Sequence, residues 1–187
     1  MLHSALSYTR SLIKETVQVG DTVVDATVGN GHDTLLLAEC VGDTGHVIGF
    51  DIQKPALETT QHKLNEANLA HRVSLHHKGH EEIDTVLSSS TDLSLVVYNL
   101  GYLPKGDKGI ITTPDTTLKS VEQALGHLKS KGLILLMIYY GHEGGETEKG
   151  AVLNYVEQLP QKEFSVLQYQ FINQKNSPPF LIAIEKR

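Results

Sequence analysis

The chain has 187 residues, of which 40% are hydrophobic and 20% charged, a composition typical of a globular protein that forms one domain, residues 1–187, around a buried core. Its net charge of −6 excludes a protein that coats nucleic acid through bulk electrostatics, although a local basic patch would still allow docking of a short RNA element. No apolar stretch reaches the roughly 20 residues that span a bilayer. The first residues lack the basic head and apolar run of a signal peptide, and a single cysteine excludes an internal disulfide. We therefore expect a cytoplasmic protein without membrane association.

The first half of the chain alternates between helical and strand patterns. Apolar residues at helical spacing predict an amphipathic helix over 2–16, and the β-branched run TVVDAT predicts a buried strand over 22–27. The same patterns predict, in order, a helix over 32–41, a strand over 46–52, a helix over 54–68, a strand over 72–77 and a helix over 79–88.

The second half continues the alternation and ends in a pair of strands. The patterns predict, in order, a strand over 93–99, a helix over 115–130, a strand over 132–140, a helix over 146–158 and two strands over 164–172 and 180–186. The whole chain therefore predicts an α/β, Rossmann-like fold with a seven-stranded, mostly parallel sheet and helices on both faces. In such sheets the ligand lies at the carboxyl ends of the strands.

The first two strands end in residues suited to a nucleotide-like ligand. Asp25, Gly29 and Gly31 form the pattern D-x-x-x-G-x-G, whose glycines allow a tight turn before a helix N-terminus. The NAD fingerprint has a third glycine where this chain has Thr34, which disfavours a dinucleotide. Asp51, after the second strand, suits a carboxylate that accepts hydrogen bonds from both hydroxyls of a ribose, a device shared by NAD and S-adenosylmethionine enzymes. A structural turn and a helix-capping aspartate are the alternatives for each feature taken alone.

The later strand ends carry further polar residues. The third strand ends HHKGHEE, where His77, His80 and Glu81 raise the alternative of a metal site. Because no fourth ligand has recognisable spacing, we expect no metal and assign this segment to the wall of an adenine pocket. The fourth strand ends NLGYLPKGD (99–107), and the fifth ends YYGHEGGETE (139–148).

Together these segments resemble a known family. Asp25, Gly29 and Gly31 match the first motif of class I S-adenosylmethionine-dependent methyltransferases, and Asp51 matches their ribose-binding acid. Residues 99–102 (N-L-G-Y) resemble the N-P-P-Y motif of enzymes that methylate exocyclic amines. More narrowly, VDATVGNGHDT, GFDIQ, NLGYLPKGD, YYGHEGGETE and NQKNSPPF resemble the bacterial YtqB or MnmM family of rRNA methylase-like proteins, over nearly the whole chain.

The resemblance implies a class I methyltransferase fold, S-adenosyl-L-methionine as cofactor and S-adenosyl-L-homocysteine as product. Its implied substrate is the aminomethyl group on the wobble uridine of tRNA, usually beside a 2-thio group. Leu100 and Gly101 stand where N-P-P-Y has prolines, so the general amine-methylase geometry does not transfer directly. The expected cofactor-binding residues are Asp25, Thr27, Gly29, Asn30, Gly31, Asp33, Asp51, Ile52, Gln53, His80, Glu81, Asn99 and Leu100.

The chemistry of methyl transfer to an amine leads to a hypothesis for the acceptor site. Asn99 would accept a hydrogen bond from the amine through its side-chain oxygen, with help from the Leu100 carbonyl. Tyr102 would pack on the uracil ring, and His142, with Tyr140 beside it, would accept the proton or hold the base edge. Loop packing for Tyr102 and a turn role for His142 are the alternatives. The expected substrate-binding residues are Leu100, Gly101, Tyr102, Lys105, Lys108, His142, Lys175 and Asn176.

The expected partner is the anticodon loop of tRNA. Because the chain has no spare length for a separate RNA-binding domain, we expect the methyltransferase domain itself to bind this loop, with a homodimer as one way to widen the basic surface. Other functions on the same fold are methylation of rRNA or of a small-molecule amine. A non-catalytic S-adenosylmethionine-binding protein is disfavoured because the polar strand ends are kept, and an NAD oxidoreductase is disfavoured by Thr34.

Overall fold

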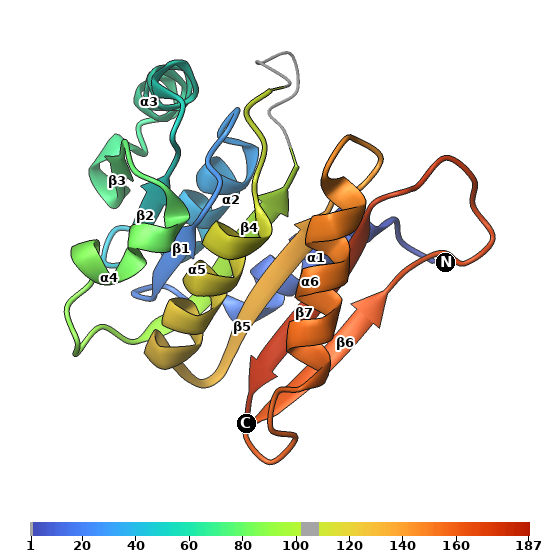
Figure 1. The fold of residues 1–187 in the computed structure, drawn as a ribbon. Coiled ribbons are helices and arrows are strands. Elements are labelled where there is room, and N and C mark those ends of the chain that lie inside the picture. Colours follow the sequence, from blue (N-terminus) through green and yellow to red (C-terminus); the bar gives the residue numbers. More distant parts are fainter. Residues whose placement is uncertain (1, 102–108) are drawn as a thin grey trace.

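The computed structural model describes residues 2–101 and 109–187, so the expected roles of Tyr102, Lys105 and Lys108 lie outside the described residues. Seven strands form one sheet (Figure 1). In sheet order they are β3 (Val73–His76), β2 (His46–Phe50), β1 (Thr22–Asp25), β4 (Leu93–Leu100), β5 (Leu128–Ile138), β7 (Phe180–Lys186) and β6 (Phe164–Tyr169). The first five are parallel to one another, whereas β7 is antiparallel to both neighbours. The predicted seven-stranded, mostly parallel sheet is confirmed.

Helices cover both faces of this sheet, as predicted (Figure 1). One face carries α1 (Ala5–Thr16), α2 (His32–Val41) and α3 (Lys54–Glu66), and the other carries α4 (Ile83–Val86), α5 (Pro114–His127) and α6 (Gly145–Glu157). Two buried apolar clusters result because neighbouring strand residues point to opposite faces. On β5, Ile134 and Leu136 pack under α5 and α6, whereas Leu133 and Leu135 pack under the other helices.

The order of the strands creates the crevice in which such folds bind ligands. The chain runs outward from β1 to β2 and β3, then returns to the other side of β1 as β4. The connections after β1 and β4 therefore diverge, and the space between them opens at the carboxyl ends of the strands. No helix within the described ranges is long and apolar enough to cross a membrane.

Several predicted boundaries are wrong, among them the start of β5 at Leu128 in place of residue 132 and the ends of two helices. The helix predicted over 79–88 is only a 3-10 turn, η2 (His80–Glu82), followed by the single turn α4. It stops because Leu87 is extended and the hydroxyl of Ser88 bonds those of Ser90 and Thr91, which competes with helical bonding. The helix predicted over 115–130 ends earlier, at His127, because Leu128 already pairs with Leu93 in the sheet.

Candidate functional site

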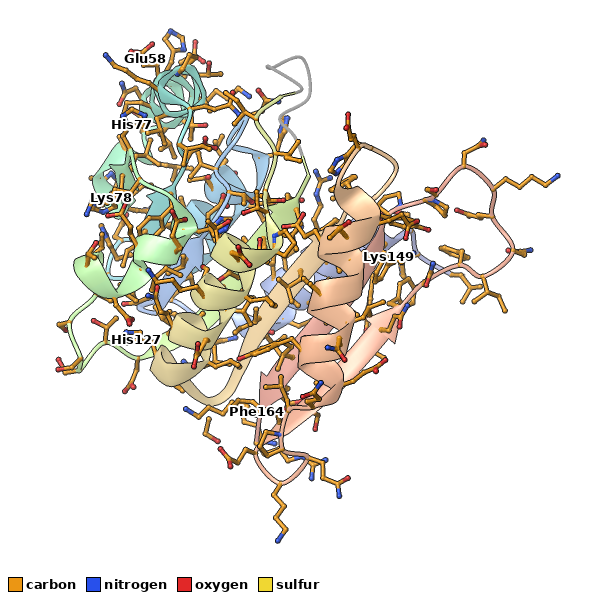
Figure 2. All side chains as sticks on the ribbon, in the orientation of Figure 1. Glu58, His77, Lys78, His127, Lys149 and Phe164 are labelled. Atoms are coloured by element: carbon orange, nitrogen blue, oxygen red, sulfur yellow. The ribbon has the colours of Figure 1, made fainter. Side chains whose placement is uncertain are left out.

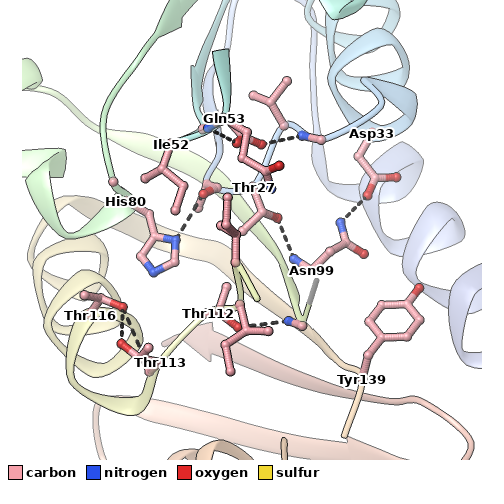
Figure 3. Close-up of a pocket in the computed structure, with 18 of the residues that line it drawn as sticks. Thr27, Asp33, Ile52, Gln53, His80, Asn99, Thr112, Thr113, Thr116 and Tyr139 are labelled. Atoms are coloured by element: carbon pink, nitrogen blue, oxygen red, sulfur yellow. Dashed lines mark hydrogen bonds between the residues drawn. The ribbon is translucent and has the colours of Figure 1, made fainter. Parts of the chain in front are cut away.

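A cavity of about 880 Å³ opens at the carboxyl ends of β1, β2, β4 and β5 (Figure 3). Most of the predicted cofactor and acceptor residues meet there, although they are far apart in the sequence. The predicted residues in its lining are Thr27, Gly29, Asn30, Asp33, Asp51, Ile52, Gln53, His80, Glu81, Asn99, Gly101, Tyr140 and His142. Asp25, Gly31 and Leu100 are buried and lie outside the lining.

The glycine turn after β1 is held from α3. Gly29 has φ of 50° and Gly31 has φ of 77°, a left-handed conformation that glycine adopts without steric cost. A Cβ atom at Gly31 would lie 2.6 Å from Oγ1 of Thr60, so no larger residue fits. The Thr60 hydroxyl donates to the Gly29 carbonyl at 3.1 Å, and the Lys63 ammonium donates to the Asn30 carbonyl at 2.6 Å. The turn is therefore fixed before any ligand arrives.

Asp51 lies at the end of β2 and faces this turn. One carboxylate oxygen accepts the Gly29 N–H and the other accepts the Gln53 N–H, both at 2.8 Å. Each oxygen of a carboxylate has two lone pairs, so both oxygens of Asp51 can still accept a hydrogen bond from a ribose hydroxyl. The neighbouring Ile52 side chain is 54% exposed and offers an uncovered apolar surface to a flat ring. The carboxylate acceptors of Asp51 and the apolar surface of Ile52 fit an adenosine.

Asp25 is placed beneath the cavity and not in it. Its side chain is fully buried, accepts the Thr34 hydroxyl at 2.6 Å and accepts the Thr27 N–H at 3.2 Å. These bonds tie the end of β1 to the first turn of α2. Burial, together with the nearby Asp33 carboxylate, raises the pKa of Asp25 to about 7.

This pKa predicts how the Asp25→Asn variant depends on pH. Because the folded pKa of about 7 lies above the ordinary 3.8, the neutral carboxyl favours the fold. That contribution is complete below pH ~4 and is lost, at about 1.4 kcal/mol per pH unit, as the pH rises to about 7. Asparagine does not ionise, so the stability of the variant relative to wild type should rise over this window in urea titrations. A difference that stays constant from pH 4 to pH 7 would contradict the assignment.

The Asn99 amide has a defined orientation (Figure 3). Its Nδ2 donates to Asp33 at 2.8 Å, and its backbone N–H donates to the Thr27 hydroxyl at 2.7 Å. An ionised carboxylate can only accept, so the amide nitrogen must face Asp33. The oxygen Oδ1 then points away from Asp33, and no described residue donates a hydrogen bond to it. The site thus presents a fixed hydrogen-bond acceptor at the end of β4.

Two consecutive tyrosines after β5 have different environments. Tyr139, which the sequence analysis missed, lies beside Asn99 in the lining (Figure 3). Burial raises the pKa of its phenol, and the Asp33 carboxylate raises it further. Tyr140 is only 8% exposed, packs edge-on against Phe180 and lies under the Lys149 ammonium, which is 4.1 Å from the ring centroid (Figure 2). Tyr139 is therefore the more accessible of the two.

The histidines near the cavity differ in their bonding. His142 uses Nδ1 to donate to the Glu143 carbonyl at 2.9 Å, which makes Nε2 the basic nitrogen of the neutral ring. His80 donates through Nδ1 to the Ala26 carbonyl at 3.2 Å, and burial lowers its pKa, so the ring is neutral. His77 bonds the Ile52 carbonyl at 2.9 Å. Within residues 2–101 and 109–187, no three His, Cys, Asp or Glu residues are grouped to hold a metal ion.

Other parts of the lining come from segments that do not follow the carboxyl end of a parallel strand directly, so the sequence analysis did not predict them. Leu6 and Arg10 enter from α1, and Thr112 comes from the segment before α5. Of the loop between β6 and β7, the lining includes Ser177. The predicted substrate residues Lys175 and Asn176 are exposed on that loop and lie outside the lining.

Comparison with known proteins agrees with this geometry. The family model described as "Putative rRNA methylase" matches residues 47–185. The chain belongs to this rRNA methylase family. An rRNA methylase-family structure from Clostridium thermocellum is 44% identical, covers 100% of both chains and has a TM-score of 0.97. A structure of a "putative methyltransferase" from Streptococcus mutans in complex with SAH is 36% identical, with the same coverage and a TM-score of 0.92.

A plant relative has a named activity. The "tRNA (mnm(5)s(2)U34)-methyltransferase, chloroplastic" of Arabidopsis thaliana is 36% identical over 181 residues, which are 92% of this chain. The match covers 66% of the plant protein, so this chain spans slightly less than two thirds of that relative.

Proposed function

We propose that this chain is an S-adenosyl-L-methionine-dependent N-methyltransferase that converts 5-aminomethyl-(2-thio)uridine at the tRNA wobble position to its methylamino form. The observation that carries the proposal is the Asn99 oxygen, fixed as a hydrogen-bond acceptor in the cavity by Asp33. An acceptor oxygen suits an amine because the amine can donate an N–H hydrogen bond to it. The name of the Arabidopsis relative supports the choice of substrate.

The residues of the cavity suit S-adenosyl-L-methionine in one orientation. Asp51 is suited to the ribose hydroxyls and Ile52 to the adenine face, with the neutral His80 beyond it. The glycine turn allows close approach of the backbone, and Asn99 lines the same cavity from β4. S-adenosyl-L-methionine, when bound, supplies an activated methyl group on a sulfonium. The S-adenosyl-L-homocysteine in the S. mutans relative supports this cofactor.

The chain's own residues would then prepare the amine. Methyl transfer forms a bond from the nitrogen lone pair to the methyl carbon as the bond from sulfur to carbon breaks. An alkyl amine has a pKa near that of lysine, about 10, so a proton must leave before the lone pair is available. Asn99 would accept one remaining N–H and so aim the lone pair. We assign the role of proton acceptor to Nε2 of His142, because this residue lines the same cavity and its Nδ1 is bonded to the Glu143 carbonyl.

Binding of the RNA would use the face around the cavity mouth. Arg10, exposed on α1, contributes to the lining and makes no ion pair with a described residue. Lys175 is exposed on the loop between β6 and β7. Both cations suit phosphate contacts that position an anticodon loop without reading its sequence. We further propose that the protein acts on tRNA in the cytoplasm and that it assembles as a homodimer.

The experiment that tests this function is a methylation assay on tRNA from cells that lack the gene. The purified protein is incubated with that tRNA and labelled S-adenosyl-L-methionine, and the nucleosides are resolved by mass spectrometry. The expected result is conversion of 5-aminomethyl-2-thiouridine to its methylamino form. Label that enters ribosomal RNA in a parallel reaction, with none in tRNA, would instead support the activity named in the family description.

A further inference from the structure

Gly101, at the exit of β4, is bound through both of its backbone polar groups to one residue. Its N–H donates to the Thr112 hydroxyl at 2.9 Å (Figure 3). Its carbonyl accepts the Thr112 N–H at 3.0 Å. Gly101 has φ of 149°, a conformation that side chains rarely allow. A Cβ atom there would lie 3.1 Å from that of Tyr139 and 3.5 Å from Nε2 of His142. The position of Gly101 is thus defined tightly beside two residues of the acceptor site.

Glu148 on α6 lies directly behind this pair of bonds. Its carboxylate is 2% exposed and makes no ion pair with any described residue. One oxygen accepts the Thr112 hydroxyl at 2.6 Å, and the other accepts the Thr117 hydroxyl of α5 at 2.7 Å. A buried carboxylate without a cation is costly, so its presence needs a reason beyond filling space.

The proton of the Thr112 hydroxyl explains what the carboxylate does. A hydroxyl has one proton to donate. Because the Thr112 hydroxyl donates its hydrogen bond to Glu148, the Thr112 oxygen presents only lone pairs to the Gly101 N–H. Without Glu148 the hydroxyl would be able to turn its proton elsewhere, and its bond to the Gly101 N–H would no longer be enforced. Glu148 therefore sets the polarity of the chain of bonds that ends at β4.

We propose that Glu148 is a positioning residue for the acceptor site: acting through Thr112, it holds Gly101 and with it the Asn99 end of β4 in the geometry that methyl transfer requires. The kinetic part of this proposal rests on the proposed N-methyltransferase function, whereas its structural part does not. Displacement of a reacting group by about 1 Å can cost about 100-fold in rate, so a small shift at Gly101 would suffice.

The kinetic test compares three variants in the methylation assay. Glu148→Ala is expected to lower kcat about 10- to 100-fold with the affinity for S-adenosyl-L-homocysteine unchanged in calorimetry, since Asp51 and the glycine turn lie at the ends of other strands. Glu148→Gln should keep most of the wild-type activity, because its amide oxygen can accept the hydrogen bond from the Thr112 hydroxyl while its nitrogen donates one to Thr117. Thr117→Val removes a bond of similar burial that does not reach Gly101, and it should keep near wild-type kcat. Equal losses in Glu148→Ala and Thr117→Val would overturn the proposal.

A second readout needs no substrate and therefore separates this proposal from the proposed function. Hydrogen exchange of the Gly101 amide, followed by NMR in the whole protein, should be slow in wild type and in Thr117→Val. It should be fast in Glu148→Ala and in Thr112→Val, the variant that removes the acceptor for this N–H with little change of shape. Unchanged protection of Gly101 in folded Glu148→Ala would refute the positioning role. Absence of methyl transfer to tRNA by wild type, with this exchange pattern present, would refute only the substrate assignment.

Discussion

Asn99→Ala is expected to slow methyl transfer to tRNA at least about 100-fold while the protein still binds S-adenosyl-L-homocysteine. Alanine keeps the backbone N–H that donates to Thr27 but removes the side-chain oxygen whose orientation is set by Asp33. The amine would then bind without a defined direction for its lone pair. Single-turnover rates with saturating cofactor measure the effect on the chemical step, and calorimetry measures the binding of S-adenosyl-L-homocysteine.

The matched control is Asn65→Ala, which removes an exposed amide on α3 whose oxygen accepts a hydrogen bond from the neighbouring Gln61 at 3.2 Å. It should behave as wild type in both measurements. If Asn99→Ala also kept the wild-type rate, the acceptor role of Asn99 would be wrong. If it lost cofactor binding and activity together, Asn99 would belong to the cofactor site alone.

Asp51→Ala should weaken binding of S-adenosyl-L-homocysteine by about 100-fold or more, because hydrogen bonds to a charged group contribute about 1.5–3 kcal/mol each. The substitution removes the acceptors proposed for the two ribose hydroxyls. It also leaves the N–H groups of Gly29 and Gln53 without the carboxylate that orders the turn. Calorimetric titration gives the affinity directly, without any RNA.

Glu58→Ala serves as the control for this loss of charge. Glu58 is an exposed carboxylate on α3 that pairs with Lys54 at 3.6 Å (Figure 2), and such surface pairs contribute little. Its removal should leave the affinity unchanged. An Asp51→Ala protein that binds S-adenosyl-L-homocysteine as tightly as wild type would exclude the ribose contact and require a different cofactor orientation.

The parts of the site that follow strand ends were predictable from sequence. Asp51 and Asn99 come directly after apolar strand runs, and parallel strands bring their carboxyl ends to one edge. The structure places both in the same cavity. The general architecture was predictable for the same reason, since alternation of strand and helix patterns permits few other arrangements.

The remaining features depend on contacts between segments that are distant in the sequence. The burial of Asp25 is set by how α2 packs over β1, which no local pattern reveals. The choice between Tyr139 and Tyr140 depends on which side of the sheet each faces after β5 ends. Arg10 reaches the cavity only because α1 packs back across the sheet. The role of Glu148 becomes visible only when α6 lies beside Thr112.

The central claim, methylation of an amine at the wobble position, is tested most directly with synthetic anticodon stem-loops. Three RNAs of identical sequence would carry uridine, 5-aminomethyluridine or 5-aminomethyl-2-thiouridine at that position, and labelled methyl incorporation would be measured for each. We expect label in the two aminomethyl RNAs, on the side-chain nitrogen, and none in the uridine RNA. Equal labelling of all three RNAs, or none in any of them while S-adenosyl-L-homocysteine still binds, would contradict the claim.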